Sequence, residues 1–393
     1  MTRNPSRKIA VLVTSRASYA RIKSTLSAIK EHPSLQLVLV VGASALLEKY
    51  GSAINVIERD GFTIDGRVYM VLEGENLVTM AKTAGIGIVE LATFFDNSRP
   101  DIVVTVADRY ETIATAIAAS YLNIPVAHVQ GGEVSGSIDE KVRHAVTKLS
   151  NVHFVATEKA AARVIRMGES PETVYVTGCP SVDLAAEVHA SPAIDFDPFE
   201  KYRGVGACFD IGQPYIVVLQ HPVTTEYESA LTQVGETLEA IYSLGVNTFW
   251  FWPNVDAGSD QVSKAIRNFR EKQPLPFIHF FKNMPPEDFL RLVRSAVCVV
   301  GNSSVGIREC SFLGVPVVNV GTRQIGRDRG KNVVDVSCER VAIAKAVREQ
   351  IAIGRYPSET LYGDGRAGQR IADLLSRIDL PKEKRFYWPQ STL

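Results

Sequence analysis

The sequence is poor in cysteine, with five residues among 393 and no Cys-x-x-Cys pair. This odd, scattered set argues against a disulfide framework and against a thiolate metal site. There is also no His-x-x-x-His pair or other spacing typical of metal ligands, so no metal is expected. A reduced, cytoplasmic protein is the simplest interpretation.

The chain also has no excess of charge of either sign, because 43 Lys and Arg residues balance 43 Asp and Glu residues. Without a basic field the chain is expected to bind neither nucleic acid nor an anionic membrane, and any anion requires a local site. Long apolar runs are absent. The run at 9–13 is broken by Arg16 and is too short for an export signal. No run approaches the roughly 20 residues of a membrane helix.

What the sequence does contain is a repeated alternation of short Val/Ile/Leu runs with longer segments of helical periodicity, typical of parallel α/β domains. Strands are expected at 9–13, 35–41, 102–106, 124–129, 153–156, 174–177, 215–219, 248–251, 277–281, 297–300 and 315–320, and helices at 19–30, 78–95, 111–121, 159–167 and 369–378. The Pro- and Gly-rich stretch 188–213 is expected to be a linker region together with a lead-in to the second domain. A ligand cleft is predicted between two doubly wound sheets, at the carboxyl ends of their strands.

Polar residues follow the first expected strands. In the first loop, Arg16 stands at a helix start, where backbone N–H groups receive an anion. Simple helix capping accounts for the neighbouring Ser and Thr equally well. This loop carries no Gly-x-Gly-x-x-Gly dinucleotide motif. Asp108 follows the strand at 102–106, where it serves either as acid, base or ribose ligand, or as the cap of the next helix.

The next strand leads into the densest polar loop of the chain. Gln130 is followed by the pair Gly131-Gly132, which permits close approach of the backbone to a ligand, and then by Glu133, Asp139 and His144. Each of these side chains has a structural alternative, such as a helix cap for Glu133 or a buried imidazole for His144. Their density in one loop favours a site.

In the second half, His221 follows the strand at 215–219 and would place an imidazole in the cleft for proton transfer near neutral pH. Asn254 and Asp256 follow the strand at 248–251, where polar side chains suit either a ligand or a helix cap. Each strand end of this half therefore offers a candidate ligand contact.

The sharpest local pattern is Gly301-Asn302-Ser303-Ser304, in which a buried strand passes through small polar residues into a helix. Backbone N–H groups at that helix start and the hydroxyls of Ser303 and Ser304 suit a diphosphate. Glu309, inside the helix, suits a ribose diol. The P-loop lysine is absent, so the pattern does not indicate hydrolysis of a nucleoside triphosphate.

These residues lie within strings that resemble the hydrolysing UDP-N-acetylglucosamine 2-epimerases, including the epimerase half of the bifunctional sialic-acid enzyme of animals. The matching strings are Ser15-Arg16-Ala17-x-Tyr19, Asp108-Arg109-Tyr110-Glu111, Gly131-Gly132-Glu133, Ser137-Ile138-Asp139-Glu140, Arg143-His144-Ala145-Val146, Gly178-Cys179-Pro180-Ser181, Gln220-His221-Pro222, Pro253-Asn254-Val255-Asp256, Gly301-Asn302-Ser303-Ser304, Gly321-Thr322-Arg323-Gln324 and Tyr362-Gly363-Asp364-Gly365. They run through most of the chain in one order, which makes the resemblance specific.

The resemblance implies a GT-B-like α/β fold of two Rossmann-like, doubly wound domains with the active-site cleft between them. Residues 1–186 would form the sugar side and 187–368 the UDP side, with a helix and tail at 369–393 crossing back to the first domain. The implied reaction eliminates UDP from UDP-N-acetylglucosamine across C-1 and C-2 to give a glycal, then adds water to give N-acetylmannosamine for sialic-acid-type sugars. No cofactor or metal is implied, and the enzyme would be a cytoplasmic homodimer or homotetramer.

The resemblance also assigns roles to residues. The predicted catalytic residues are Asp108, Asp139, His221, Gln130 and Glu133. The predicted residues for binding UDP and sugar are Arg16, Arg109, Arg143, His144, Asn254, Asp256, Ser303, Ser304, Glu309 and Arg323. Asp108 and Asp139 match carboxylates that transfer protons, which suits the weakly acidic sugar C–H.

Three departures from the family pattern leave the sugar and the nucleotide open. Gln130 stands where the animal sequences have Glu, and an amide cannot carry a proton. Ser18 and Arg21 stand where those sequences have Asp and Lys, and Asn283 where they have His. The alternatives are a 2-epimerase for a UDP- or GDP-linked 2,4-diacetamido-6-deoxyglucose of the legionaminic-acid pathway, a non-hydrolysing epimerase, a glycosyltransferase, and a sugar-nucleotide sensor without turnover.

Overall fold

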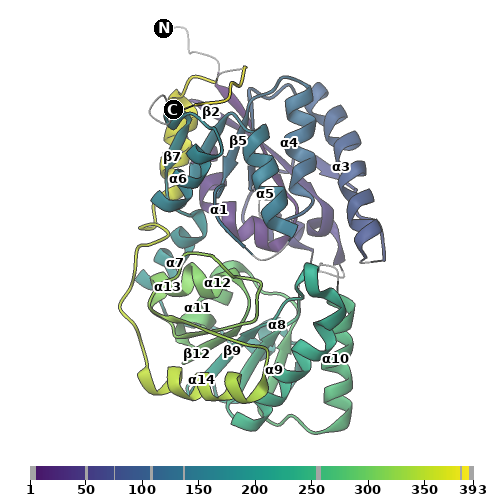
Figure 1. The fold of residues 1–393 in the computed structure, drawn as a ribbon, viewed down its shortest axis with the longest axis vertical. Coiled ribbons are helices and arrows are strands. Elements are labelled where there is room, and N and C mark those ends of the chain that lie inside the picture. The colour runs from purple at the N-terminus through teal and green to yellow at the C-terminus, as the bar shows by residue number, and fades with distance from the viewer. Residues whose placement is uncertain are drawn as a thin grey trace.

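The computed structural model describes residues 6–48, 52–74, 76–106, 109–135, 138–253, 258–380 and 383–388. The chain folds into two α/β halves, each built on one seven-stranded sheet, which confirms the predicted fold class. The halves stand end to end, with the amino-terminal half uppermost in Figure 1.

The helices and strands follow one another in the alternating order that the sequence predicts. The first half contains β1 (Arg7–Val13), α1 (Arg16–Glu31), β2 (Leu35–Gly42), α2 (Ala53–Arg59), β3 (Gly66–Val68), α3 (Leu77–Ser98), β4 (Ile102–Val106), α4 (Thr112–Tyr121), β5 (Val126–Val129), α5 (Ile138–Leu149), β6 (Val152–Val155), α6 (Glu158–Arg166), β7 (Val174–Val176) and α7 (Pro180–Ala190). The second half contains α8 (Pro198–Tyr202), β8 (Val205–Gly206), β9 (Tyr215–Leu219), α9 (Ala230–Leu244), β10 (Asn247–Phe251), α10 (Ser259–Lys272), β11 (Ile278–Phe281), α11 (Pro286–Ser295), β12 (Cys298–Gly301), α12 (Ser304–Ile307), α13 (Glu309–Leu313), β13 (Val317–Val320), β14 (Val333–Val336) and α14 (Arg340–Ile353), and α15 (Ala367–Arg377) follows it.

The two sheets share one doubly wound topology. The strand orders are β3-β2-β1-β4-β5-β6-β7 and β14-β13-β12-β9-β10-β11-β8. Neighbouring strands among the described residues are parallel, except that β8 runs antiparallel to β11. Each sheet reverses its strand order at one point, between β1 and β4 and between β9 and β12. Doubly wound folds bind ligands beyond the carboxyl ends of the strands at such points.

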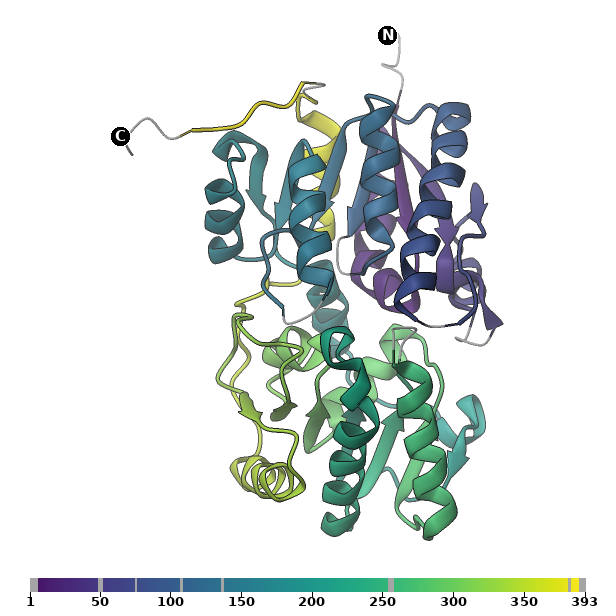
Figure 2. The same ribbon diagram turned by 45° about the vertical axis from the view of Figure 1, so that its right-hand side comes forward.

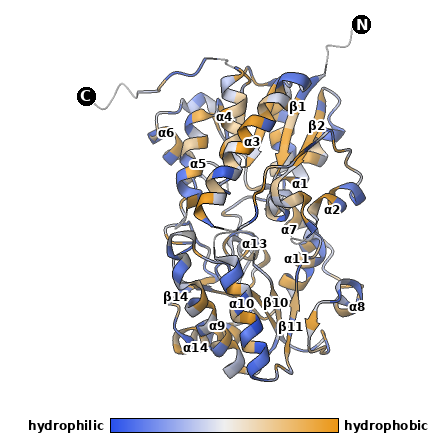
Figure 3. Ribbon diagram, turned by 90° about the vertical axis from the view of Figure 1, so that its right-hand side faces the viewer, coloured by the Kyte–Doolittle hydropathy of each residue, from blue (hydrophilic) through white to orange (hydrophobic). Residues whose placement is uncertain are grey.

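The expected strands all form, with small shifts at their ends, because most of them are continuous apolar runs buried on both faces, although β7 is partly exposed. Residues 9–13 of β1 and all of β9 are at most 5% exposed, and Figure 3 shows β1 and β2 in the hydrophobic colour. The sequence does not predict β3, β8 or β14, which are short and partly exposed. Within 188–213, which is expected to be a linker and a lead-in to the second domain, α8 and β8 form, and β8 extends the second sheet.

Helix α3 corrects another prediction. With 22 residues, it is long and apolar enough, by length and composition alone, to cross a membrane. Its Leu91 and Phe95 pack with Val103 and Ala114 in one core cluster of the first half, as in a helix that covers a sheet. The expectation that no apolar run approaches this length is therefore wrong.

Two helices connect the halves. Leu184 and Val188 of α7 pack with Phe251 in the core of the second half. Ile371 and Leu375 of α15 pack in the core of the first half, against α1. Figure 2 shows the yellow α15 beside the first sheet. The domain limits at 186 and 368 remain predictions.

Candidate active site

Three loops at the carboxyl ends of the second sheet are tied together by Asn302. Its Oδ1 accepts from the His221 backbone N–H at 2.8 Å, and its Nδ2 donates to the His221 carbonyl, also at 2.8 Å. The Asn302 carbonyl accepts from Gln324 Nε2 at 2.8 Å and from Arg323 Nη1 at 3.3 Å. The loops after β9, β12 and β13 are thus held in one arrangement at the switch point of this sheet.

A cavity opens beside these loops, between the two halves of the chain. The space inside it that is open to a water-sized sphere is about 100 Å³. Four predicted site residues line it, namely Arg16, His221, Ser303 and Glu309. The rest of its wall is mainly apolar and includes Phe251, Trp252, Met284 and Phe289. An apolar wall with a few convergent polar groups suits a ligand that carries both a flat ring and polar groups.

Arg16 reaches this cavity from the first half. Ser15 caps α1 by accepting from the Ser18 N–H, so Arg16 is the first residue of the helix. Its Nη1 donates to the Lys282 carbonyl at 2.7 Å and to Asn283 Oδ1 at 3.0 Å, both in the second half. Burial lowers the pKa of Arg16 to about 10, which leaves the guanidinium charged at neutral pH. A cation fixed by both halves therefore stands at the cavity.

His221 brings an uncharged imidazole to the same wall. Burial, and then the charges of Arg323 and Arg16, hold the pKa of His221 well below its usual value. The ring is therefore neutral at pH 7, with one nitrogen able to accept a hydrogen bond or a proton. It contributes an acceptor to a region that already holds several cations.

Glu309 adds a carboxylate that is only 5% exposed. Its Oε2 is buried and has no hydrogen-bond partner among the described residues. A buried acceptor without a partner is costly, and a hydroxyl group of a ligand at this wall would satisfy it. Ser303 lies nearby as the N-cap of α12.

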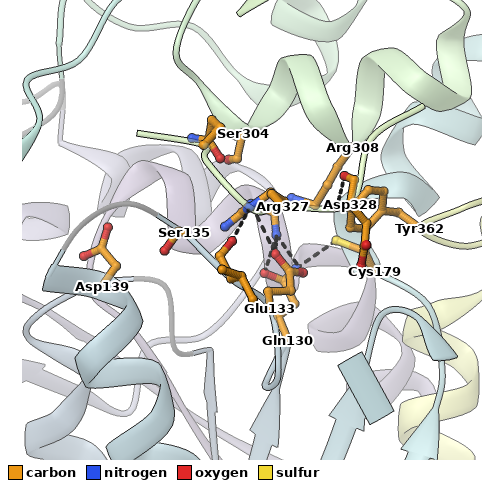
Figure 4. A network of polar contacts seen from close by, with 12 residues as sticks. Gln130, Glu133, Ser135, Asp139, Cys179, Ser304, Arg308, Arg327, Asp328 and Tyr362 are labelled. Atoms are coloured by element: carbon orange, nitrogen blue, oxygen red, sulfur yellow. Dashed lines mark hydrogen bonds and ion pairs between the residues drawn. The ribbon is translucent and has the colours of Figure 1, made fainter. Parts of the chain in front are cut away.

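A second group of polar side chains is buried between the halves (Figure 4). Glu133 Oε2 lies 3.2 Å from Arg327 Nη1, and Glu133 Oε1 lies 3.4 Å from Arg308 Nη1. Arg143 Nη1 donates to the Glu133 carbonyl at 3.0 Å and to Ser135 Oγ at 3.1 Å. Burial alone would raise the pKa of Glu133, but the charges of Arg308 and Arg327 outweigh it and hold that pKa at about 2. Glu133 is thus an ionised partner of two arginines from the second half.

Gln130 belongs to the same network. Its backbone lies in the left-handed region, with φ of +66°, which is uncommon for a residue other than glycine. Its Oε1 accepts from Arg308 Nη1 at 2.8 Å, and its Nε2 donates to Cys179 Sγ at 2.8 Å. Both the oxygen and the nitrogen of the amide group therefore have partners. An ionised Glu at this position could accept from Arg308 but could not donate to Cys179.

Asp139 and Ser304 make further contacts between the halves. Asp139 Oδ2, in the first turn of α5, lies 3.9 Å from Arg323 Nη2. Ser304 Oγ accepts from Arg21 Nη2 at 2.8 Å. Arg323 also donates to the Asn302 carbonyl, so it connects Asp139 to the loops that hold His221.

Two other predicted site residues, Arg109 and His144, pair with a neighbour in their own half, and the charge of Arg109 also lowers the pKa of His221. Arg109 Nε donates to Glu111 at 2.6 Å in a buried pair. His144 is partly exposed and lies 3.4 Å from Glu140. Asp108, Asn254 and Asp256 lie outside the described residues. In the described part of the chain, no group of three or more His, Cys, Asp or Glu side chains is placed to hold a metal ion.

Sequence reasoning missed Arg308, Arg327 and the apolar wall of the cavity. Arg308, which directly precedes Glu309, is fully buried. Its position as a charged residue at the start of a buried helix is the only feature of the sequence that could indicate its role. Arg327 lies four residues after Arg323 in the loop that follows β13, and nothing in the local sequence indicates its contact with Glu133.

Comparison with known proteins agrees with this architecture. Residues 27–376 match the family described as UDP-N-acetylglucosamine 2-epimerase. A UDP-N,N'-diacetylbacillosamine 2-epimerase (hydrolyzing) from Legionella pneumophila is 34% identical over 374 residues, which cover 95% of this chain and 97% of that protein. A UDP-N-acetylglucosamine 2-epimerase from Neisseria meningitidis is 29% identical over 97% of this chain and 98% of that protein.

Solved structures show the same fold. A UDP-GlcNAc 2-epimerase from Neisseria meningitidis, bound to UDP-GlcNAc, has a TM-score of 0.77 at 17% identity, covering 94% of this chain and 99% of that one. The Methanocaldococcus jannaschii enzyme in complex with UDP-GlcNAc and UDP has a TM-score of 0.76 at 18% identity, with the same coverage. The chain therefore belongs to the UDP-N-acetylglucosamine 2-epimerase family.

Proposed function

We propose that this chain is a hydrolysing 2-epimerase that acts on a UDP-linked 2-acetamido sugar. The observation that carries the proposal is the position of Arg323, which contacts Asp139 of the first half and the Asn302–His221 pair of the second. A carboxylate is thereby connected through a cation to the loop that carries a neutral imidazole at the cavity wall. Elimination of a diphosphate from a sugar requires this set of groups, with the cation at the leaving group and the carboxylate at the C–H bond.

In the proposed first step, a carboxylate removes the proton from C-2 while the bond between C-1 and the UDP oxygen breaks, giving a glycal. Arg16, Arg323 and the hydroxyls of Ser303 and Ser304 stabilise the charge that develops on the departing diphosphate. In the second step, water adds its oxygen to C-1 and a proton reaches C-2 from the opposite face. We assign these proton transfers to Asp139 and Asp108.

Glu133 and Gln130 receive a different role in this proposal, although both are predicted as catalytic. The pKa of Glu133, about 2, suits a permanent anion and not a group that exchanges protons near neutral pH. Gln130 is occupied by Arg308 and Cys179. We propose that both side chains hold the two halves in register, while Glu309 binds the ribose hydroxyls through its unpartnered oxygen.

Two sugars are candidates. N-acetylglucosamine is the sugar named for the family and for the Neisseria relative. The Legionella relative is named for N,N'-diacetylbacillosamine, a 2,4-diacetamido sugar, and its identity to this chain is higher, at 34% against 29%. The higher identity to the Legionella relative is the observation that supports the second candidate function, 2-epimerisation of a UDP-linked 2,4-diacetamido sugar.

The test is to incubate the purified chain with UDP-N-acetylglucosamine and, separately, with UDP-N,N'-diacetylbacillosamine, and to follow the products by NMR. We expect UDP and a free sugar with inverted configuration at C-2 from one of them. A UDP-linked C-2 epimer would instead identify a non-hydrolysing epimerase. Tight UDP binding with unchanged substrate would favour a sensor, and sugar transfer to an added acceptor would favour a glycosyltransferase.

A further inference from the structure

The carboxyl-terminal segment 383–388 returns over the first half after α15 and is fastened there by Lys384 (Figure 2). The Lys384 Nζ donates to the Thr147 carbonyl at 2.9 Å and to the Ser150 carbonyl at 2.5 Å. The same ammonium group pairs with Glu169 Oε2 at 2.6 Å. One side chain near the end of the chain therefore makes three contacts with the first half.

The next residues of the segment lie on the same surface. The Tyr387 N–H donates to the Gly168 carbonyl at 2.8 Å. The Phe386 ring packs directly on Gly168, because a Cβ added there would lie 2.2 Å from a ring carbon. This close approach requires the absence of a side chain at Gly168, where φ is +88°.

Glu169 explains why a lysine is needed at this place. Its side chain is only 3% exposed, and Lys148 Nζ at 2.6 Å and His153 Nε2 at 3.1 Å share its carboxylate with Lys384. Burial alone would raise the pKa of Glu169, but hydrogen bonds from His153, Lys148 and Lys384 outweigh it and hold that pKa at about 2. The carboxylate is thus a buried anion that depends on cations, one of which the tail supplies.

The two carbonyls that accept from Lys384 lie at the carboxyl end of α5. Carbonyls at a helix end lack partners within the helix, and a cation there also favours the helix dipole. The opposite end of α5 carries Asp139, eight residues before Thr147 and therefore about 12 Å away along the helix axis. Thr147 Oγ1 also lies 3.2 Å from His128 Nδ1, two residues before Gln130.

We propose that Lys384 is a positioning residue, which fixes α5 along its axis and thereby sets Asp139 against Arg323. The inference rests on the proposed function, since it assigns Lys384 an effect on turnover at that site. Lys384 acts on the first half alone. Most of the groups assigned to UDP, including Ser303, Glu309 and Arg323, belong to the second half, so UDP affinity is independent of the tail.

The test compares Lys384→Met with Lys384→Arg and with Arg385→Met. Arg385 is the control, because it is exposed and its described ion pair is with the adjacent Glu383. We expect Lys384→Met to lower kcat about tenfold, since displacements of about 1 Å in a catalytic group can cost up to 10²-fold in rate. The UDP dissociation constant should stay within about twofold, Lys384→Arg should restore most of kcat, and Arg385→Met should change neither quantity.

Hydrogen exchange provides a readout that does not depend on turnover. In Lys384→Met, peptides covering 138–150 should exchange faster than in the unsubstituted protein, while peptides from α9 should not change. Unchanged exchange at 138–150, or an unchanged kcat, would overturn the proposal. So would equal losses of kcat and UDP affinity that Lys384→Arg does not repair, because these indicate general destabilisation. If the unsubstituted chain turns over neither sugar, the proposed function fails, and the exchange at 138–150 still decides whether the tail holds α5.

Discussion

Two buried carboxylates of this chain, Glu133 and Glu309, lie in neighbouring regions and differ in how far the protein satisfies their oxygens. Glu133 lies in the network between the halves, where Arg308 and Arg327 pair with it and hold its pKa at about 2. Glu309 lies at the cavity wall, with one buried oxygen that has no partner among the described residues. A carboxylate whose hydrogen-bonding capacity is filled by the protein holds the structure together, whereas one with an unfilled acceptor has capacity left for a ligand.

Asp139 provides the strongest test of this comparison, because we propose that it transfers protons although it faces a cation. Its Oδ2 lies 3.9 Å from Arg323 Nη2, which is a long distance for an ion pair. Asp139→Asn should lower kcat by about 10³-fold, within the range for loss of a general base, while UDP binding measured by calorimetry survives. Full residual activity would remove Asp139 from the mechanism.

Glu133→Gln should have the largest effect on stability. The amide has nearly the same shape, but it leaves Arg308 and Arg327 buried without their anion, which costs about 3–5 kcal/mol. Urea unfolding of both proteins at pH 7 measures this difference. A loss below about 1 kcal/mol, accompanied by a large fall in kcat, would mean that Glu133 is a catalytic group after all.

Glu309→Gln should show the reverse pattern. We expect UDP affinity to fall about tenfold or more, as for a lost hydrogen bond to a charged group, with the free energy of unfolding changed by less than about 1 kcal/mol. Calorimetric titration with UDP, compared with titration with uracil, locates the loss at the ribose. An unchanged affinity for UDP together with a large loss of stability would mean that Glu309, like Glu133, stabilises the structure and does not bind the ligand.

The sequence predicts much of the fold, because buried parallel strands are continuous Val/Ile/Leu runs. It also predicts where the site lies, since the carboxyl ends of such strands meet. It does not predict which polar residues bind one another across the halves. Glu133 and Arg308 are 175 positions apart, so no local pattern indicates their contact. Strand β8 is missed for a related reason, because its pairing with β11 is decided by packing and not by its two residues.

Gln130→Glu should have the smallest effect. The new carboxylate keeps the contact with Arg308 and loses only the donation to Cys179. We therefore expect kcat within about threefold of the original value and the same product, since the side chain belongs to the network and not to the cavity. A large change in rate or a new product would place position 130 among the groups that touch the sugar.

The most direct measurement is the fate of the C-2 hydrogen when the chain acts on its UDP-sugar in D₂O. Removal of the C-2 proton and re-addition from the other face predict a free, C-2-inverted sugar that carries deuterium at C-2, with UDP released in equal amount. The same reaction with Asp139→Asn should form both products about 10³-fold more slowly. A free sugar that keeps both its C-2 hydrogen and its original configuration would contradict elimination and hydration at this site.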